Sequence, residues 1–109
     1  MEKTVNIGGK EYKLVANGAT PRVYRGLFKK DVFNGMSHAV TSNGEILDSE
    51  VFENLAFCMA VQGGSISIGA KIEDWLAEMA SPMSIVDVAA EVMELWGETT
   101  ATTSNEKKE

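Results

Sequence analysis

Two apolar stripes at helical spacing occupy the stretch from residue 72 to residue 96. The first recurs every three or four residues, as one face of a helix does, and consists of Ile72, Trp75, Leu76 and Met79. Ser81 and Pro82 then supply an N-cap hydroxyl and a proline suited to the first helical turn, so they predict the start of a second helix. The apolar face predicted for this helix contains Ile85, Val88, Ala89, Val92, Leu95 and Trp96. We expect the helix to end at Gly97, because glycine is common just beyond helix C-termini.

Apolar and polar residues alternate near the amino terminus, on both sides of Gly8-Gly9. Thr4–Ile7 and Lys10–Leu14 are therefore predicted to form a β-hairpin with a two-residue glycine turn. A two-stranded hairpin is only marginally stable alone. We expect its apolar side chains to rest on helices of the same chain, and edge-to-edge pairing with another copy is the second possibility.

The middle of the chain contains two further helical patterns. Thr20 and Pro21 resemble a cap followed by a first-turn proline, and the next apolar residues form pairs four apart. Gly26 weakens this helix, so we expect it to be short and held by tertiary contacts. Residues 34–48 contain two Asn-Gly pairs without a helical period and are predicted to be a loop. Asp48 can cap the next helix, whose 55–61 segment is apolar on every side and is predicted to lie at the centre of the domain.

These elements predict an α+β fold that is mainly α, with an N-terminal β-hairpin, about four helices and a disordered C-terminal tail. A chain of 109 residues suffices for one core but not two, so residues 1–97 are interpreted as a single domain. Residues 98–109 contain nothing apolar enough to bury and are predicted to be the disordered tail.

The net charge of −6 argues against nucleic-acid binding, whose affinity comes mainly from Lys and Arg contacts to phosphates. It argues equally against docking on anionic lipid. No stretch approaches the ~20 apolar residues of a membrane-spanning helix, and the amino terminus lacks the apolar region of a signal peptide. We therefore expect a cytosolic protein with neither nucleic-acid nor membrane partners.

The residues that usually perform catalysis are few and poorly placed. His38 is the only histidine and falls in the predicted loop, whereas Cys58 falls within the all-apolar helix, where a thiol behaves as a small hydrophobe. The glycine pairs match neither the phosphate-binding loop nor the dinucleotide-binding fingerprint. We therefore predict a non-enzymatic protein, with no catalytic residues, metal or cofactor.

Protein-binding surfaces are the remaining candidates. An acidic stripe on the outer side of the last helix consists of Asp87, Glu91, Glu94 and Glu98. Its like charges repel at three- and four-residue spacing and would lie near the helix end that prefers cations, so a partner could supply what the monomer lacks. A basic stripe consists of Arg22, Arg25 and Lys29. The alternative for both stripes is an ordinary solvated helix face. Trp75 and Trp96 lie on apolar stripes and are expected in the core, with anchoring of a partner as the alternative.

Five segments together resemble the tail assembly chaperones of long-tailed phages and prophages of Gram-positive bacteria. They occur in the order IGGKEYKL, TPRVYRGLFKKDVF, ENLAFCMA, IEDWLAEM and VMELW, and the resemblance extends over nearly the whole chain up to Trp96. One departure is Lys29-Lys30, where this family is expected to have a glycine after Leu-Phe.

The resemblance implies a non-enzymatic protein of the bacterial host cytoplasm that is absent from the mature virion. Such chaperones bind the long, largely helical tape measure protein and keep it soluble while the tail tube polymerises around it. Many are also made in a longer, frameshifted form whose extension recruits the tail tube protein, and the ending NEKKE fits the shorter form. Binding along one long ligand favours self-association, so a homo-oligomer is expected. The alternative function is a small acidic adaptor or regulatory module of mobile-element origin.

Overall fold

A computed structural model describes the backbone of residues 1–108 and the side chains as far as Thr100. The described chain forms two strands followed by five helices. The α+β fold dominated by helices is confirmed. The elements are β1 (Glu2–Ile7), β2 (Lys10–Val15), α1 (Thr20–Phe28), α2 (Val32–Ala39), α3 (Ser49–Gln62), α4 (Ile72–Ala77) and α5 (Met83–Lys108).

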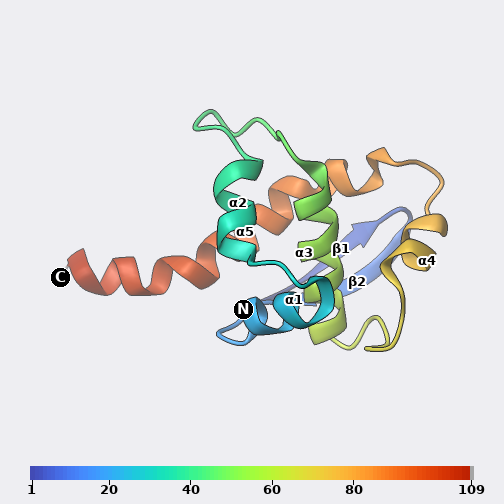
Figure 1. The fold of residues 1–109 in the computed structure, drawn as a ribbon, viewed down its shortest axis with the longest axis horizontal. Helices are drawn as coiled ribbons and strands as arrows, with labels where there is room; N and C mark the ends of the chain where they lie inside the picture. The colour runs from blue at the N-terminus through green and yellow to red at the C-terminus, as the bar shows by residue number, and fades with distance from the viewer. Residues whose placement is uncertain (109) are drawn as a thin grey trace.

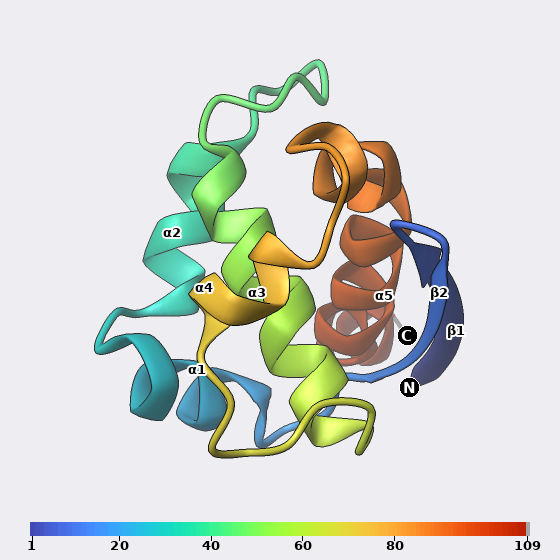
Figure 2. The same ribbon diagram turned by 90° about the vertical axis from the view of Figure 1, so that its right-hand side faces the viewer.

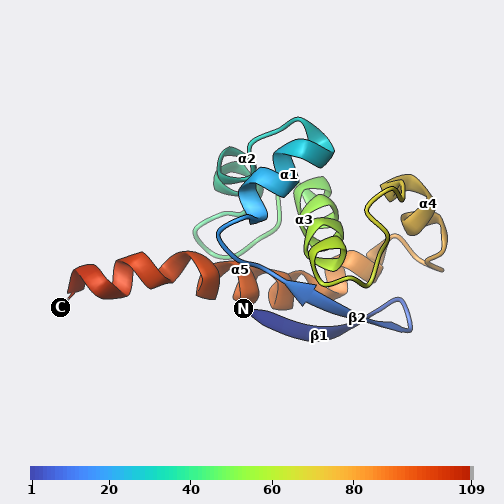
Figure 3. The same cartoon turned by 90° about the horizontal axis from the view of Figure 1, so that it is seen from below.

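The hairpin β1–β2 packs by one face on the helices, as the alternation predicts. The strands are antiparallel, and Val5 lies opposite Tyr12. Gly8 and Gly9 have φ of 63° and 90°, values that glycine adopts without steric penalty. The inward side chains Val5, Ile7, Tyr12 and Leu14 are all buried. Figure 3 shows the hairpin below α3 and α5, with which β2 and β1 respectively make their main helix contacts.

Helix α3 is the centre of the domain and contacts β2, α1, α2 and α5. Figure 2 shows it between α1 and α2 on one side and α5 with the hairpin on the other. Residues 55–60 are all buried, which confirms the position predicted for this segment. Asp48 caps the helix by accepting a hydrogen bond from the Glu50 amide at 3.0 Å, also as predicted. A helix surrounded by other elements has no side left for water, and its sequence is accordingly apolar all round.

Helix α1 is short and tertiary contacts hold it, but its cap differs from the prediction. Thr20 is the first helical residue rather than the N-cap, and its buried hydroxyl accepts a hydrogen bond from the Asn17 amide at 2.9 Å. The same hydroxyl donates to Gln62 at the end of α3 at 2.7 Å. This polar link to a neighbouring helix competes with local capping, and it joins the start of α1 to the end of α3.

The predicted loop at residues 34–48 is partly wrong, because Val32–Ala39 forms α2. Asp31 caps this helix by accepting from the Phe33 amide at 3.3 Å. Asn34 and Gly35 disfavour helix in isolation. Burial of Val32 and Ala39 supplies the tertiary contacts that override this weak local preference.

The two C-terminal helical patterns are confirmed, with one correction. Ser81 accepts a hydrogen bond from the Met83 amide at 3.0 Å and so caps α5 as predicted. The helix does not end at Gly97 but runs to Lys108, past the body of the domain (Figure 1). Thr99 and Thr100 belong to it, and their hydroxyls donate to the Leu95 and Trp96 carbonyls at 2.9 and 3.0 Å. The predicted helix end at Gly97 is therefore wrong, whereas the division into residues 1–97 and a tail of residues 98–109 stays a prediction. The side chains of residues 101–109 lie outside the description, so disorder there stays a prediction.

Candidate protein-binding surfaces

The acidic stripe lies along the middle of α5 and not at its C-terminal end. Its first and last members are 87 and 98, whereas the helix runs from 83 to 108. The influence of the helix dipole falls off within the last turn. The sequence predicted an unfavourable interaction between these carboxylates and the C-terminal end of the helix dipole. This interaction is absent, because the prediction depended on a helix end at Gly97.

Lys3 of β1 offsets part of the repulsion within the acidic stripe. Its ammonium lies 2.8 Å from Glu94 and 3.9 Å from Glu91. The hydrogen bond from Lys3 lowers the pKa of Glu94, and the same bond raises the pKa of Lys3. The cation that the stripe lacks locally is thus supplied in part by the chain's own hairpin. Asp87 and Glu98 are exposed, and contact of the stripe with another protein stays a prediction.

Replacing Lys3 with methionine should raise the pKa of Glu94 toward its ordinary value of 4.5, because both the hydrogen bond and the nearby charge are lost. A carboxylate whose pKa is lowered by folding stabilises the fold at pH values above its ordinary pKa. This contribution is lost as the pH falls through the lowered pKa. The measurement is an NMR titration of the Glu94 side-chain carboxyl.

Lys13→Met is the matched control for this titration, because Lys13 pairs with Glu2 on the same hairpin, 3.5 Å away. It should leave the pKa of Glu94 unchanged. An ordinary Glu94 pKa in the unsubstituted protein would contradict the Lys3 contact.

The basic stripe lies on α1, whose main helix contact is with α3 (Figure 2). Arg22, Arg25 and Lys29 are exposed, and no ion pair joins them to the acidic stripe among the residues described. Lys29 is also the C-cap of α1, with a left-handed φ of 60°. That conformation suits glycine, the residue expected here from the family pattern. No described ion pair thus joins the two stripes, and the role predicted for each stays a prediction.

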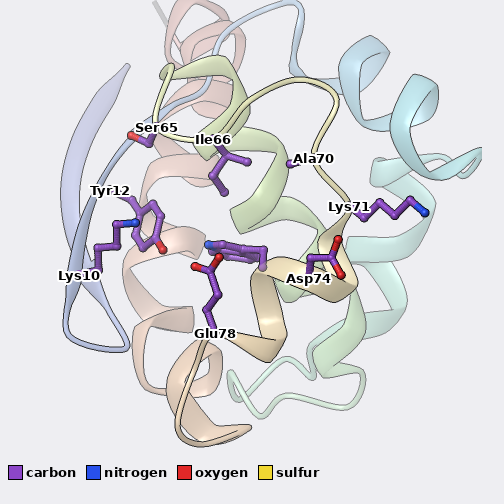
Figure 4. Close-up of a pocket in the computed structure, with 9 residues that line it drawn as sticks. Lys10, Tyr12, Ser65, Ile66, Ala70, Lys71, Asp74 and Glu78 are labelled. Atoms are coloured by element: carbon purple, nitrogen blue, oxygen red, sulfur yellow. The ribbon is translucent and has the colours of Figure 1, made fainter.

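Trp75 is a core residue, as expected by default. Its ring packs edge-on against Tyr12 at a centroid distance of 5.7 Å, and it packs in a tilted arrangement against Phe57 at 5.5 Å. The indole Nε1 is buried without a hydrogen-bond partner in the described part of the chain. Beside it lies an open cavity of about 200 Å³, and Figure 4 shows Lys10 and Tyr12 of β2 facing Glu78 across it. Trp75 lines this cavity, although only 4 % of its surface is exposed.

The fold buries most of Trp96, and only 9 % of its surface is exposed. Trp96 also lines an apolar groove. Its ring lies 5.3 Å from that of Phe33, which is 54 % exposed although it is large and apolar. The groove encloses about 340 Å³ and is lined by Asn17, Gly18, Pro21, Phe33, Trp96, Thr99 and Thr100. We call it the Phe33–Trp96 groove.

The Phe33–Trp96 groove could not be found from the sequence, because three distant segments form it. Residues 17–21 precede and begin α1, Phe33 belongs to α2, and Trp96 to Thr100 belong to α5. Phe33 was assigned to no helical face, because it directly precedes residues 34–48, which were predicted to be a loop. Trp96 gave only a weak signal, as the last apolar residue of the final stripe.

Cys58 lies in the core beside α1, as predicted. Its sulfur is 3.8 Å from the Thr20 carbonyl oxygen, and burial raises its pKa to about 12. Because the thiolate is the reactive form, the thiol is inert at neutral pH. His38 is exposed at the end of α2, and its Nδ1 lies 2.9 Å from the Asn34 carbonyl oxygen. Within residues 1–100, no three His, Cys, Asp or Glu side chains are placed to hold a metal ion.

Comparisons with family models, curated proteins and solved structures found no match to this chain. Within the described residues, no helix combines the length and the apolar character needed to cross a membrane. Any functional assignment therefore depends on the sequence pattern and on the surfaces described above.

Proposed function

We propose that this protein is a tail assembly chaperone of a long-tailed phage or prophage of a Gram-positive bacterium. In this role it binds the tape measure protein in the host cytoplasm and keeps it soluble while tail tube subunits assemble around it. It performs no chemistry and is absent from the mature virion. The resemblance of the five sequence segments suggests this function, and the Phe33–Trp96 groove is the structural observation that supports it.

The groove has the properties of a site for an amphipathic helix. Such helices bind by laying an apolar face into a hydrophobic groove. Phe33 and Trp96 supply two aromatic rings, which are residues enriched among the dominant contacts of protein interfaces. Phe33 is 54 % exposed and adjoins the groove, so a partner that fills the groove would also cover this side chain. A long helical protein with repeated apolar stripes fits this requirement.

The polar surroundings of the groove also suit a chaperone. Hydroxyl and amide groups of Asn17, Thr99 and Thr100 lie at its rim, so a bound helix can form hydrogen bonds at its edges. The net charge of −6 keeps copies of the chaperone soluble while their apolar grooves are occupied. One small domain can thus cover an apolar stripe and add charge to the complex.

The test is co-expression of the full chain with the long helical protein encoded beside it. We expect the chaperone to raise the soluble fraction of that protein and to co-purify with it. Phe33→Glu should reduce the co-purified amount at least ~10-fold, because a carboxylate in the groove loses its hydration without gaining a partner.

Ile68→Glu is the matched control for this assay, because Ile68 is 79 % exposed and lies in the α3–α4 connection, away from the groove. It should bind as the unsubstituted chain does. If the unsubstituted chain neither solubilises nor captures the long protein, the proposed function is wrong. If Phe33→Glu captures it fully, the function survives but the groove is not its site.

A further inference from the structure

The two edges of the hairpin differ in how their backbone groups are satisfied. Met1 and Ala16 exchange two hydrogen bonds, each of 2.9 Å. Hydrogen-bonded and non-hydrogen-bonded pairs alternate along an antiparallel ladder. The printed register therefore directs the N–H and C=O groups of Glu2, Thr4 and Asn6 away from β2, toward the outer edge of β1.

The outer edge of β2 is closed by the chain itself. Ser65 accepts from the Lys13 amide at 2.8 Å and donates to the Lys13 carbonyl at 3.2 Å. Gly63 lies against the same carbonyl so closely that a Cβ on Gly63 would come within 2.0 Å of the oxygen. The α3–α4 connection thus covers this edge, and a further strand cannot pair there.

The outer edge of β1 has no such cover. No backbone hydrogen bond of Glu2, Thr4 or Asn6 to a third segment occurs within the described residues, and all three side chains are exposed. Proteins often protect such an edge with proline, a bulge or an inward-facing charge. β1 contains no proline, and its register with β2 runs without a bulge. Its one inward lysine, Lys3, is neutralised by Glu94.

The side chains of this edge are complementary to a second copy in one register. When two β1 strands run antiparallel with Thr4 opposite Thr4 of the second copy, Glu2 lies opposite Asn6. Threonine pairs are favourable across strands, and the Asn6 amide group can donate to the Glu2 carboxylate. Centring the pair on Lys3 instead would oppose two lysines. Charge repulsion disfavours this register.

We propose that β1 pairs with β1 of a second copy of this chain, antiparallel and centred on Thr4, to form a continuous four-stranded sheet in a symmetric dimer. The three outward-facing residues of each strand then form three hydrogen-bonded pairs, with about six new hydrogen bonds. The interface is the same patch on both copies, as two-fold symmetry requires. This inference is independent of the proposed function, because the Phe33–Trp96 groove belongs to other elements.

Thr4→Pro tests the pairing through the backbone. The Thr4 amide points outward, so proline removes an intermolecular donor and leaves the ladder between β1 and β2 intact. We expect analytical ultracentrifugation to show a dimer for the unsubstituted chain and at least a ~10-fold rise in its dissociation constant for Thr4→Pro. Thr4→Val keeps the amide and should dimerise normally. Circular dichroism of both variants checks that the fold is retained.

A second measurement does not depend on proline being tolerated. Opposed residues of a hydrogen-bonded antiparallel pair have Cα atoms ~5.5 Å apart, within the range that a disulfide spans. Thr4→Cys should therefore form a disulfide-linked dimer on oxidation, whereas Glu11→Cys on β2 should not. Cys58 does not interfere, because it is buried and its pKa is raised to about 12.

Three outcomes would overturn the proposal. They are a strictly monomeric unsubstituted chain at high concentration, full dimerisation of a folded Thr4→Pro variant, and no more crosslinking at Thr4→Cys than at Glu11→Cys. If the chain is monomeric but Thr4→Pro reduces capture of another protein, the edge belongs to a strand of that protein and self-pairing is wrong. Failure of the co-expression assay leaves the dimer proposal standing.

Discussion

Phe57→Ala should lower the free energy of unfolding by about 3–5 kcal/mol, the range observed when a large buried aromatic side chain is truncated. Phe57 is 1 % exposed and lies on α3, the central helix. Its ring contacts Phe28 of α1 at a centroid distance of 6.1 Å and Trp75 of α4 at 5.5 Å. Truncation therefore opens a cavity where three helices meet, and neighbours on separate elements cannot all collapse into it.

The measurement is equilibrium unfolding in urea, followed by tryptophan fluorescence. Small domains have a total stability of about 5–15 kcal/mol, so the variant should be marginally folded or unfolded at 37 °C. Phe33→Ala is the control of matched residue type, because Phe33 is 54 % exposed. It should cost less than ~1.5 kcal/mol. Equal losses at the two positions would contradict the central place given to α3.

Gly63→Ala should destabilise the protein by about 3 kcal/mol, at the upper end of the cost of forcing extra atoms into a packed site. A Cβ on Gly63 would lie 2.0 Å from the Lys13 carbonyl oxygen and 2.8 Å from its carbon. Both are backbone atoms of β2, so the clash is relieved only by moving the strand away from the end of α3. The φ of Gly63 is −78°, which any residue adopts, so the cost comes from this contact alone.

Gly97→Ala is the matched control for Gly63→Ala and should have the opposite sign. Gly97 lies within α5, and a Cβ there would meet nothing within 4 Å. Alanine in a helix interior is favoured over glycine by about 1 kcal/mol, so this variant should be more stable than the unsubstituted chain. Thermal unfolding of both variants measures the difference. Destabilisation by Gly97→Ala would show that the helix ends there after all.

The candidate surfaces were only partly predictable. The acidic stripe follows from spacing along one helix, and its members do share a face of α5. The contact between Lys3 and Glu94 joins residues 91 positions apart, and no local pattern indicates it. The same limit applies to the Phe33–Trp96 groove, whose walls come from three segments. Periodicity shows which side of a helix is apolar, but it does not show which other segment covers that side.

The sequence by itself determined the hairpin, the buried central helix, and the Asp48 and Ser81 caps, because each depends on residues a few positions apart. Only the tertiary structure decided that Val32–Ala39 is helical, that α5 continues through Gly97, and that Thr20 links two helices rather than capping one. It also decided which edge of the hairpin is covered. In these cases weak local preferences compete with contacts between distant segments. The distant contacts prevail because burial and hydrogen bonding there outweigh a local preference of about 1 kcal/mol or less per residue.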